Sequence, residues 1–146
     1  MKTVPEIGIH NRLVERHIPD SKEERRRTAA SGRYAIKMVM NGQTASIGTA
    51  TGRAAVVMNK SDMARIREDT VIISKVASQD LMTVISKACA MATEYGGQAA
   101  SVLELARKYG IPAVVGVPRL MKAVKDGDLV RIDGINGTVE IMKRMQ

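Results

Sequence analysis

The stretch that most constrains the fold is ASVLELARKYGIPAVVG, residues 100–116. Its first ten residues suit a helix, Gly110 stands where a left-handed residue commonly ends one, and Pro112 cannot continue it. The apolar run 113–117 then reads as a buried strand. A helix that stops abruptly and leads straight into a buried strand is typical of a domain in which helices cover a sheet.

The rest of the chain alternates in the same way. Strands are expected at 33–40, 46–58, 70–76 and 89–93, and two more are expected around Asn136-Gly137 near the C-terminus. Asn41-Gly42 predicts a tight hairpin turn directly after the first strand. Strands that alternate with helices predict a mixed α/β domain.

Two further helices are expected. Ser78 resembles an N-cap, and Leu81, Val84, Ile85 and Ala88 follow at the spacing of one helical face. The other helix is expected to begin with Pro118 at its first position and to run towards Asp126-Gly127.

Composition limits the class of protein. The 146 residues contain no Phe, no Trp, three Tyr and ten Met, so the core must be aliphatic. The single cysteine, Cys89, excludes an internal disulfide and fits a reducing compartment. No apolar run approaches membrane-spanning length, so we expect a soluble cytoplasmic protein without a membrane partner.

The net charge of +8 raises nucleic acid as a partner. The one dense cluster, Arg25-Arg26-Arg27, has no aromatic residue beside it on which a base could stack, which favours a solvated surface. Residues 1–40 are interpreted as an N-terminal arm plus the first strand, contacting a partner or packed on the domain. Residues 41–146 are interpreted as the domain proper.

Several kinds of site find no support. One Cys and two His cannot form a structural zinc site, and no glycine-rich nucleotide motif is present, so neither a metal nor a cofactor is expected. His10 and His17 both lie in the N-terminal arm. Asp126, Asp128 and Asp133 stand beside glycines, where turn chemistry explains them.

Gly96-Gly97 is the more informative feature. Glycines allow a backbone to approach a ligand closely, and the following helix would offer free N–H groups and a positive dipole end to an anion. A strand-to-helix turn that needs positive φ would use the same pair. The sequence leaves both interpretations open.

Four blocks in order resemble the mobile, phosphohistidine-carrying domain of the PEP-utilising enzymes, which include PEP synthase, pyruvate phosphate dikinase and enzyme I of the sugar phosphotransferase system. A similar domain extends some bacterial pyruvate kinases. The blocks are ASIGTATGRA (45–54), DTVIISKVASQDLMTVISKACAMATEYGG (69–97), ARKYGIPAVVG (106–116) and LMKAVKDGDLVRIDGINGTVEI (120–141). Ile47 replaces a proline of the family pattern. Together they cover about residues 42–142.

The resemblance implies a swivelling β/β/α fold and a histidine that shuttles a phosphoryl group between two active sites. The family loop reads Gly-Gly-x-Thr-Ser-His, whereas this chain has Gly96, Gly97, Gln98, Ala99, Ala100 and Ser101. Ser101 therefore occupies the expected phosphohistidine position, and no histidine follows residue 17. A serine hydroxyl needs a neighbouring base, and its phosphate ester is stable, so the position is expected to be inactive.

Three functions remain open. The first is a stand-alone mobile domain without its histidine, a binding or regulatory subunit whose protein partner supplies the ATP- or PEP-binding domain. The chain itself is expected to be too short to hold that domain. A phosphate-like anion is a further candidate ligand, held by Gly96, Gly97, Ala99, Ala100 and Ser101. The second is an active phosphotransferase component that uses Ser101 or a partner's residue, and the third is a basic nucleic-acid-binding domain, which the charge pattern does not favour.

Overall fold

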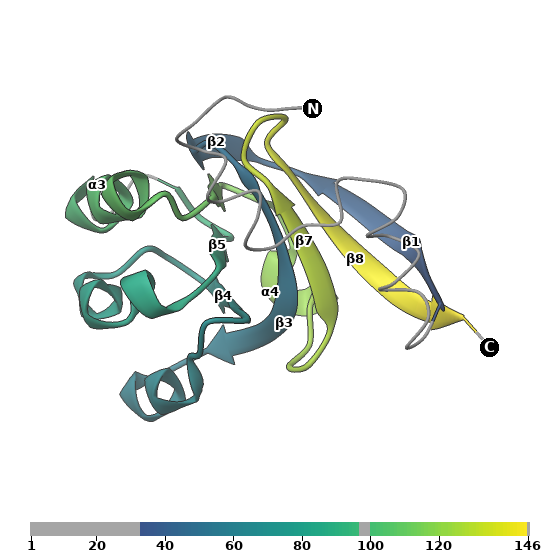
Figure 1. Ribbon diagram of the computed structural model, residues 1–146, viewed down its shortest axis with the longest axis horizontal. Coiled ribbons are helices and arrows are strands. Elements are labelled where there is room, and N and C mark those ends of the chain that lie inside the picture. The colour runs from purple at the N-terminus through teal and green to yellow at the C-terminus, as the bar shows by residue number, and fades with distance from the viewer. Residues whose placement is uncertain (1–32, 97–99, 146) are drawn as a thin grey trace, which may run out of the picture.

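The fold is built on one eight-stranded mixed sheet (Figure 1). The structure is a computed structural model that describes residues 33–96 and 100–145. The strands are β1 (Arg33–Asn41), β2 (Gln43–Ser46), β3 (Thr49–Val57), β4 (Thr70–Ser74), β5 (Ala90–Thr93), β6 (Ala113–Val115), β7 (Leu129–Asp133) and β8 (Thr138–Met145). Their order is β1-β8-β7-β3-β4-β5-β6-β2, in which β3 to β6 run parallel and all other pairs are antiparallel. The predicted mixed α/β class is confirmed.

The helical elements are short, and they cover the parallel strands. They are η2 (Lys60–Arg65), η3 (Gln79–Thr83), η4 (Ile85–Lys87), α3 (Ala100–Tyr109) and α4 (Leu120–Ala123). Figure 1 shows α3 and the 3₁₀ helices together on one side of β4 and β5, with α4 behind the sheet. The helices therefore divide between two faces.

The core has two halves, one on each face of the parallel strands. Ile72 of β4 packs with residues of η3, η4 and α3, whereas its neighbours Val71 and Ile73 pack with α4 and the antiparallel strands. A strand buried on both faces reads as a continuous apolar run, which is how 70–76 was interpreted from the sequence. The largest buried side chains are aliphatic, and the Cys89 side chain is buried as well.

The predicted amphipathic helix at 78–88 is wrong in type. The segment forms two 3₁₀ helices, in which the N–H groups of Leu81, Val84 and Lys87 each bond to the carbonyl three residues earlier. Ser78 is the N-cap, but its side chain makes no capping bond. The β-branched run Thr83-Val84-Ile85 is also a poor helix former, so packing of the apolar positions prevails over α-helical periodicity.

The predicted hairpin at Asn41-Gly42 is also wrong. β1 pairs with β8 and β2 pairs with β6, at opposite ends of the sheet order, and only Gly42 separates β1 from β2, so the two ends of the sheet lie close together in space here. The N–H of Gly42 donates to the carbonyl of Gly137 at 2.8 Å instead of closing a turn. The hairpin expected around Asn136-Gly137 is confirmed, because β7 and β8 pair on either side of it.

Of the last two predicted helices, the first is confirmed and the second begins later than expected. α3 spans the predicted residues and ends as expected, with Gly110 at φ 69° and the Ile111 N–H bonded to the Ala106 carbonyl at 2.7 Å. Pro118, however, lies outside α4, whose N-cap is Arg119. Arg119 adopts φ 67°, a left-handed conformation that separates Pro118 from the helix.

Candidate functional site

The candidate site lies at the carboxyl edge of the parallel strands. β3, β4 and β5 end level with one another, since Val57 pairs with Ser74 and Ser74 pairs with Thr93. β6 continues the same edge and ends at Val115. In open α/β sheets ligands bind outside this edge, because the loops that leave the strands converge there.

The first two residues after β5 are fixed by backbone hydrogen bonds. Beyond the end of β5, the N–H groups of Glu94 and Tyr95 donate to the carbonyls of Ser74 and Lys75 at 3.1 and 2.9 Å. The Thr93 hydroxyl donates to the Tyr95 carbonyl at 2.7 Å and so holds the chain as it leaves the strand. These bonds hold Glu94 and Tyr95 at the carboxyl edge, beside the end of β4.

The predicted site residues fall partly within the structure. Gly96 is exposed at the carboxyl edge, and Ala100 and Ser101 are the first two residues of α3. Gly97 and Ala99 lie outside the described residues. The N–H groups of the first turn of an α-helix have no partner within the helix, so Ala100 and Ser101 carry backbone donors that α3 itself does not use. The anion site remains a prediction.

Position 101 has a simple environment. Ser101 is half-buried at the start of α3, whose buried residues Val102, Leu103 and Ala106 fix the helix against the core. The described residues contain no histidine, because both histidines precede residue 33. They also contain no cluster of His, Cys, Asp and Glu that could hold a metal ion.

Two charged side chains lie on the loops at this edge. The Lys75 ammonium stands 6.0 Å from the centre of the Tyr95 ring, which is a cation–π contact. A carboxylate oxygen of Glu94 accepts the Met121 N–H at 2.8 Å and so links the β5–α3 loop to α4. Because this hydrogen bond occupies Glu94, the carboxylate has a structural task at the junction.

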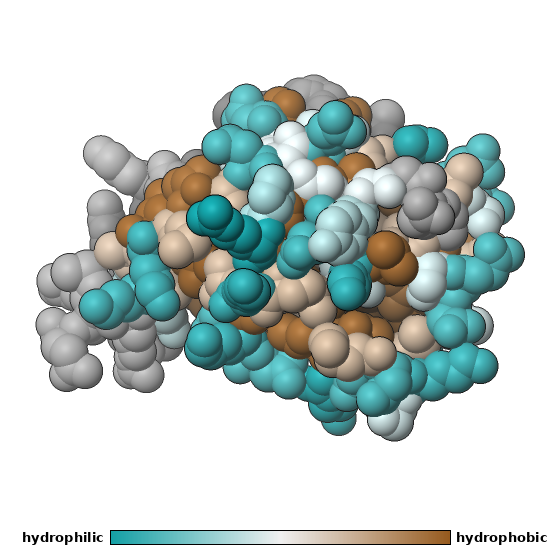
Figure 2. All heavy atoms as spheres, turned by 180° about the vertical axis from the view of Figure 1, so that it is seen from behind, coloured by the Kyte–Doolittle hydropathy of each residue, from teal (hydrophilic) through white to brown (hydrophobic). Residues whose placement is uncertain are grey.

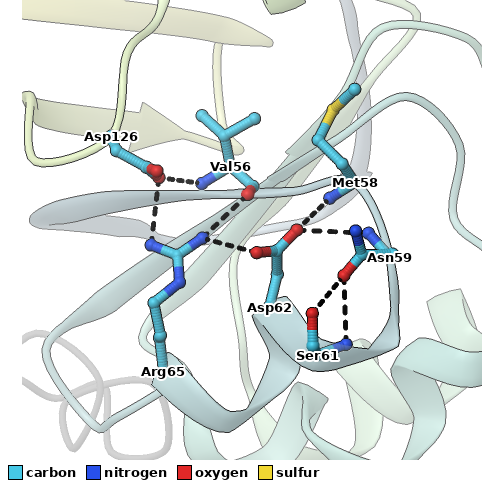
Figure 3. Close-up of polar contacts among 7 residues, drawn as sticks. All are labelled: Val56, Met58, Asn59, Ser61, Asp62, Arg65 and Asp126. Carbon is cyan, nitrogen blue, oxygen red and sulfur yellow. Dashed lines mark hydrogen bonds and ion pairs between the residues drawn. The ribbon is translucent and has the colours of Figure 1, made fainter.

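A second polar cluster, which sequence reasoning missed, lies at the end of β3 (Figure 3). The Arg65 guanidinium bridges Asp126 at 3.2 Å and Asp62 at 3.3 Å and donates to the Val56 carbonyl at 3.0 Å. Asp126 also accepts the Val56 N–H at 2.6 Å. These side chains satisfy both backbone groups of Val56 beyond the point where β7 pairs with β3.

This cluster corrects the interpretation of the three aspartates. Asp128 accepts the Lys125 N–H, and Asp133 accepts the N–H groups of Ile135 and Asn136, so turn chemistry explains both. Asp126 instead bonds to Val56, 70 residues away in sequence. In the sequence, only Asp62 and Arg65 stand close together, at i and i+3. No other pattern in the sequence indicates the cluster.

The ionisation of the cluster follows its hydrogen bonds. The pKa of Asp62 is lowered, chiefly because the N–H groups of Met58 and Asn59 donate to it, and the Arg65 charge adds to the effect. The pKa of Arg65 is raised, first by its hydrogen bond to Asp126. Groups held in their charged forms are poor proton-transfer catalysts, so the cluster fits a structural role better than an acid–base one.

Two hollows lined by described residues lie away from position 101. One of about 700 Å³ lies between Ile66–Asp69 and Ser86-Lys87, before β4 and β5 begin. The other, of about 580 Å³, lies between the end of β1 and α4. No helix among the described residues is long and apolar enough to cross a membrane.

Comparison with known proteins identifies the scaffold. Residues 66–137 match the model of the family described as "PEP-utilising enzyme, mobile domain". The chain is 32% identical over 103 residues to a probable phosphoenolpyruvate synthase of Pyrococcus abyssi. The aligned region covers 70% of this chain and 13% of that protein. It is also 32% identical over 101 residues to a rifampicin phosphotransferase of Bacillus cereus. That aligned region covers 69% of this chain and 12% of the phosphotransferase.

A solved structure shares the fold at low sequence identity. The crystal structure of Thermococcus kodakaraensis aconitase X in its holo-form superimposes with a TM-score of 0.56 and 18% identity, over 73% of this chain and 99% of that one. The match to the family model and the similarity to the synthases confirm the resemblance seen in the four sequence blocks. Over residues 66–137 the chain therefore belongs to the mobile-domain family of the PEP-utilising enzymes.

Proposed function

We propose that this chain is a mobile-domain subunit that does not carry phosphoryl groups itself and that binds and regulates a phosphoryl-transfer enzyme. The partner would supply the nucleotide- and PEP-binding domains that make up most of the related synthases. The observation that carries the proposal is the residue at the start of α3. There the strand β5 and the helix α3 match the order expected of the family scaffold, but position 101 holds a half-buried serine.

The chemistry of position 101 supports a binding role. A serine hydroxyl becomes a nucleophile only when a base removes its proton. The described residues provide no histidine for that task, and the carboxylate of Glu94, just after β5, is bonded to the Met121 N–H. The backbone donors of Gly96, Ala100 and Ser101 do not depend on a side chain, so weak binding of a phosphate-like anion is retained in the proposal.

The test is intact-mass analysis after incubation with PEP and, separately, with ATP and magnesium. The expected result is no adduct of about 80 Da, the mass added by one phosphoryl group. The measurement is made at neutral or alkaline pH, where a phosphohistidine would also survive. The Ser101→Ala variant is the matched control.

An adduct present in the wild type and absent from Ser101→Ala would overturn the proposal in favour of an active phosphotransferase component. Stability of that adduct in acid would further identify it as a serine ester. Purification from the native host, followed by mass spectrometry of bound proteins, tests the other half of the proposal. A PEP- or ATP-utilising enzyme is expected there, and recovery of nucleic acid alone would contradict it.

A further inference from the structure

Within the described part of the chain, the strand β1 has an unpaired edge with exposed apolar side chains. It stands at one end of the sheet order, and among the described residues it pairs with β8 alone. Ile36, Met38 and Val39 are 54%, 42% and 49% exposed. Edge strands of this kind recruit further strands unless they are protected.

Protection of β1 is limited to its first part. The pairing register with β8 shifts between Ile36 and Met38, and Lys37 is exposed there. A register shift and an edge lysine both discourage strand addition. Beyond them, residues 38–41 pair regularly with β8, from Ile141 to Thr138. This second part of the strand remains suited to a new partner.

An open groove of about 580 Å³ runs beside that second part. It is lined by Met38, Val39, Met40, Asn41, Pro118, Arg119, Lys122 and Ala123. Figure 2 looks onto this side of the molecule, behind the sheet, and shows apolar side chains exposed between strongly hydrophilic ones. The lining is apolar apart from Asn41 and two cations, and no carboxylate belongs to it.

The two cations are available to a ligand. Arg119 and Lys122 are exposed, and neither forms an ion pair within the described part of the chain. Arg119 is also the one described non-glycine residue with positive φ, at 67°. A strained residue that persists without a compensating side-chain contact is a reason to look for function. Here the strain places a guanidinium-bearing residue at the groove.

We propose that the groove binds an extended, acidic segment of a partner protein. The segment adds as a strand to β1 at residues 38–41, sets apolar side chains on Met38 and Met40, and places carboxylates against Arg119 and Lys122. The inference rests on the proposed function for the existence of a partner, and it names the surface that the partner uses. The charge of the lining selects an acidic segment over a basic one.

Other occupants fit the groove less well. A second copy of the chain would bring another Lys37 and another pair of groove cations against the first, in a protein of net charge +8. Nucleic acid would match the charge, but none of the lining residues is aromatic, so bases would find no stacking surface on this apolar floor.

The test uses the full chain and a fluorescent peptide of alternating valine and glutamate, about ten residues long to match a strand. A peptide with lysine in place of glutamate is its control. Fluorescence anisotropy is expected to show binding of the glutamate peptide only. Arg119→Gln with Lys122→Gln should weaken binding roughly thirtyfold, the combined effect of two exposed ion pairs at the upper end of their range.

Two further variants separate the groove from general charge. Lys87→Gln with Lys108→Gln removes the same charge from other exposed positions and should leave the affinity unchanged. Met38→Asp should weaken binding even though the groove cations remain. Circular dichroism confirms that each variant is folded, and the single variant Lys122→Gln provides an intermediate value that should fall between the wild type and the double variant.

Four results would overturn the inference. One is the absence of peptide binding by the full chain, and another is equal weakening by the two double variants. The third is a dimer in solution that Met38→Asp dissociates, which would assign the groove to a second copy. Competition by single-stranded DNA that is insensitive to Met38→Asp would likewise assign the cations to a polyanion. None of these results bears on phosphorylation of Ser101, so failure here is distinguishable from failure of the proposed function.

Discussion

Replacement of Gly52 by alanine should destabilise the fold strongly. A Cβ at this position would lie 2.3 Å from the Asp69 carbonyl oxygen and 2.8 Å from the Cys89 sulfur. The Asp69 carbonyl accepts the Arg53 N–H at 3.0 Å, and the Cys89 N–H is bonded to Thr70 at 2.9 Å. Neither neighbour can withdraw without breaking the junction of β3 and β4, so the cost should reach the upper part of the overpacking range, about 3 kcal/mol.

The matched control is Gly127→Ala. Gly127 has φ 88°, and a Cβ there would meet no atom within 4 Å. It should therefore cost only the left-handed penalty, about 1 kcal/mol. For a domain of this size the two variants should lower the melting temperature by roughly 10 and 3 °C, measured by circular dichroism. Equal losses would refute the argument, because they would show that β3 and β4 can separate at Gly52 without cost.

Three other predictions concern the ionisation of Asp133, the cluster around Arg65, and position 101 at the start of α3. Burial raises the pKa of Asp133, but the hydrogen bonds from Asn136 and Ile135 outweigh it and hold that pKa below the ordinary value. Its contribution to stability is thus complete above the unfolded pKa of about 4 and is lost as the pH falls through the folded value. The stability difference between wild type and Asp133→Asn, from urea denaturation, should therefore shrink on acidification, and a constant difference would contradict this. Arg65→Lys keeps the positive charge but removes the planar guanidinium group that bonds to Asp62, Asp126 and Val56 at the same time. It should cost no more than about 1 kcal/mol, since the pairs are largely exposed, and a larger loss would show that the guanidinium group is essential. Ser101→His should change stability by only about 0.5 kcal/mol, as at a surface position, and a clearly unfolded variant would show that residue 101 is part of the core.

Much of the sheet could be predicted because its strands carry local signals. β4 is buried on both faces and therefore reads as a continuous apolar run, and α3 ends at a glycine with positive φ before a proline. Each signal lies within a few residues of the element that it specifies. The same locality explains why β5, β6 and the β7–β8 hairpin were recognisable.

The errors arose where distant contacts decide the structure. Asn41-Gly42 has the composition of a turn, but β1 and β2 pair with strands that come almost a hundred and about seventy residues later. Residues 78–88 have helical periodicity, which 3₁₀ turns reproduce well enough to bury the same side chains. Asp126 and the groove beside β1 each depend on segments that meet only in the folded sheet.

The candidate site illustrates why a scaffold is easier to predict than its chemistry. The bonds that hold the loop after β5 join the backbone of Glu94 and Tyr95 to β4, and the Thr93 hydroxyl to the Tyr95 carbonyl. α3 is held by Val102, Leu103 and Ala106 on its buried face and by Arg107, which donates to the Ala45 carbonyl at 2.8 Å. None of these contacts uses the side chain of Ser101. These contacts do not depend on residue 101, so they can be retained whether or not that position carries a phosphoryl group.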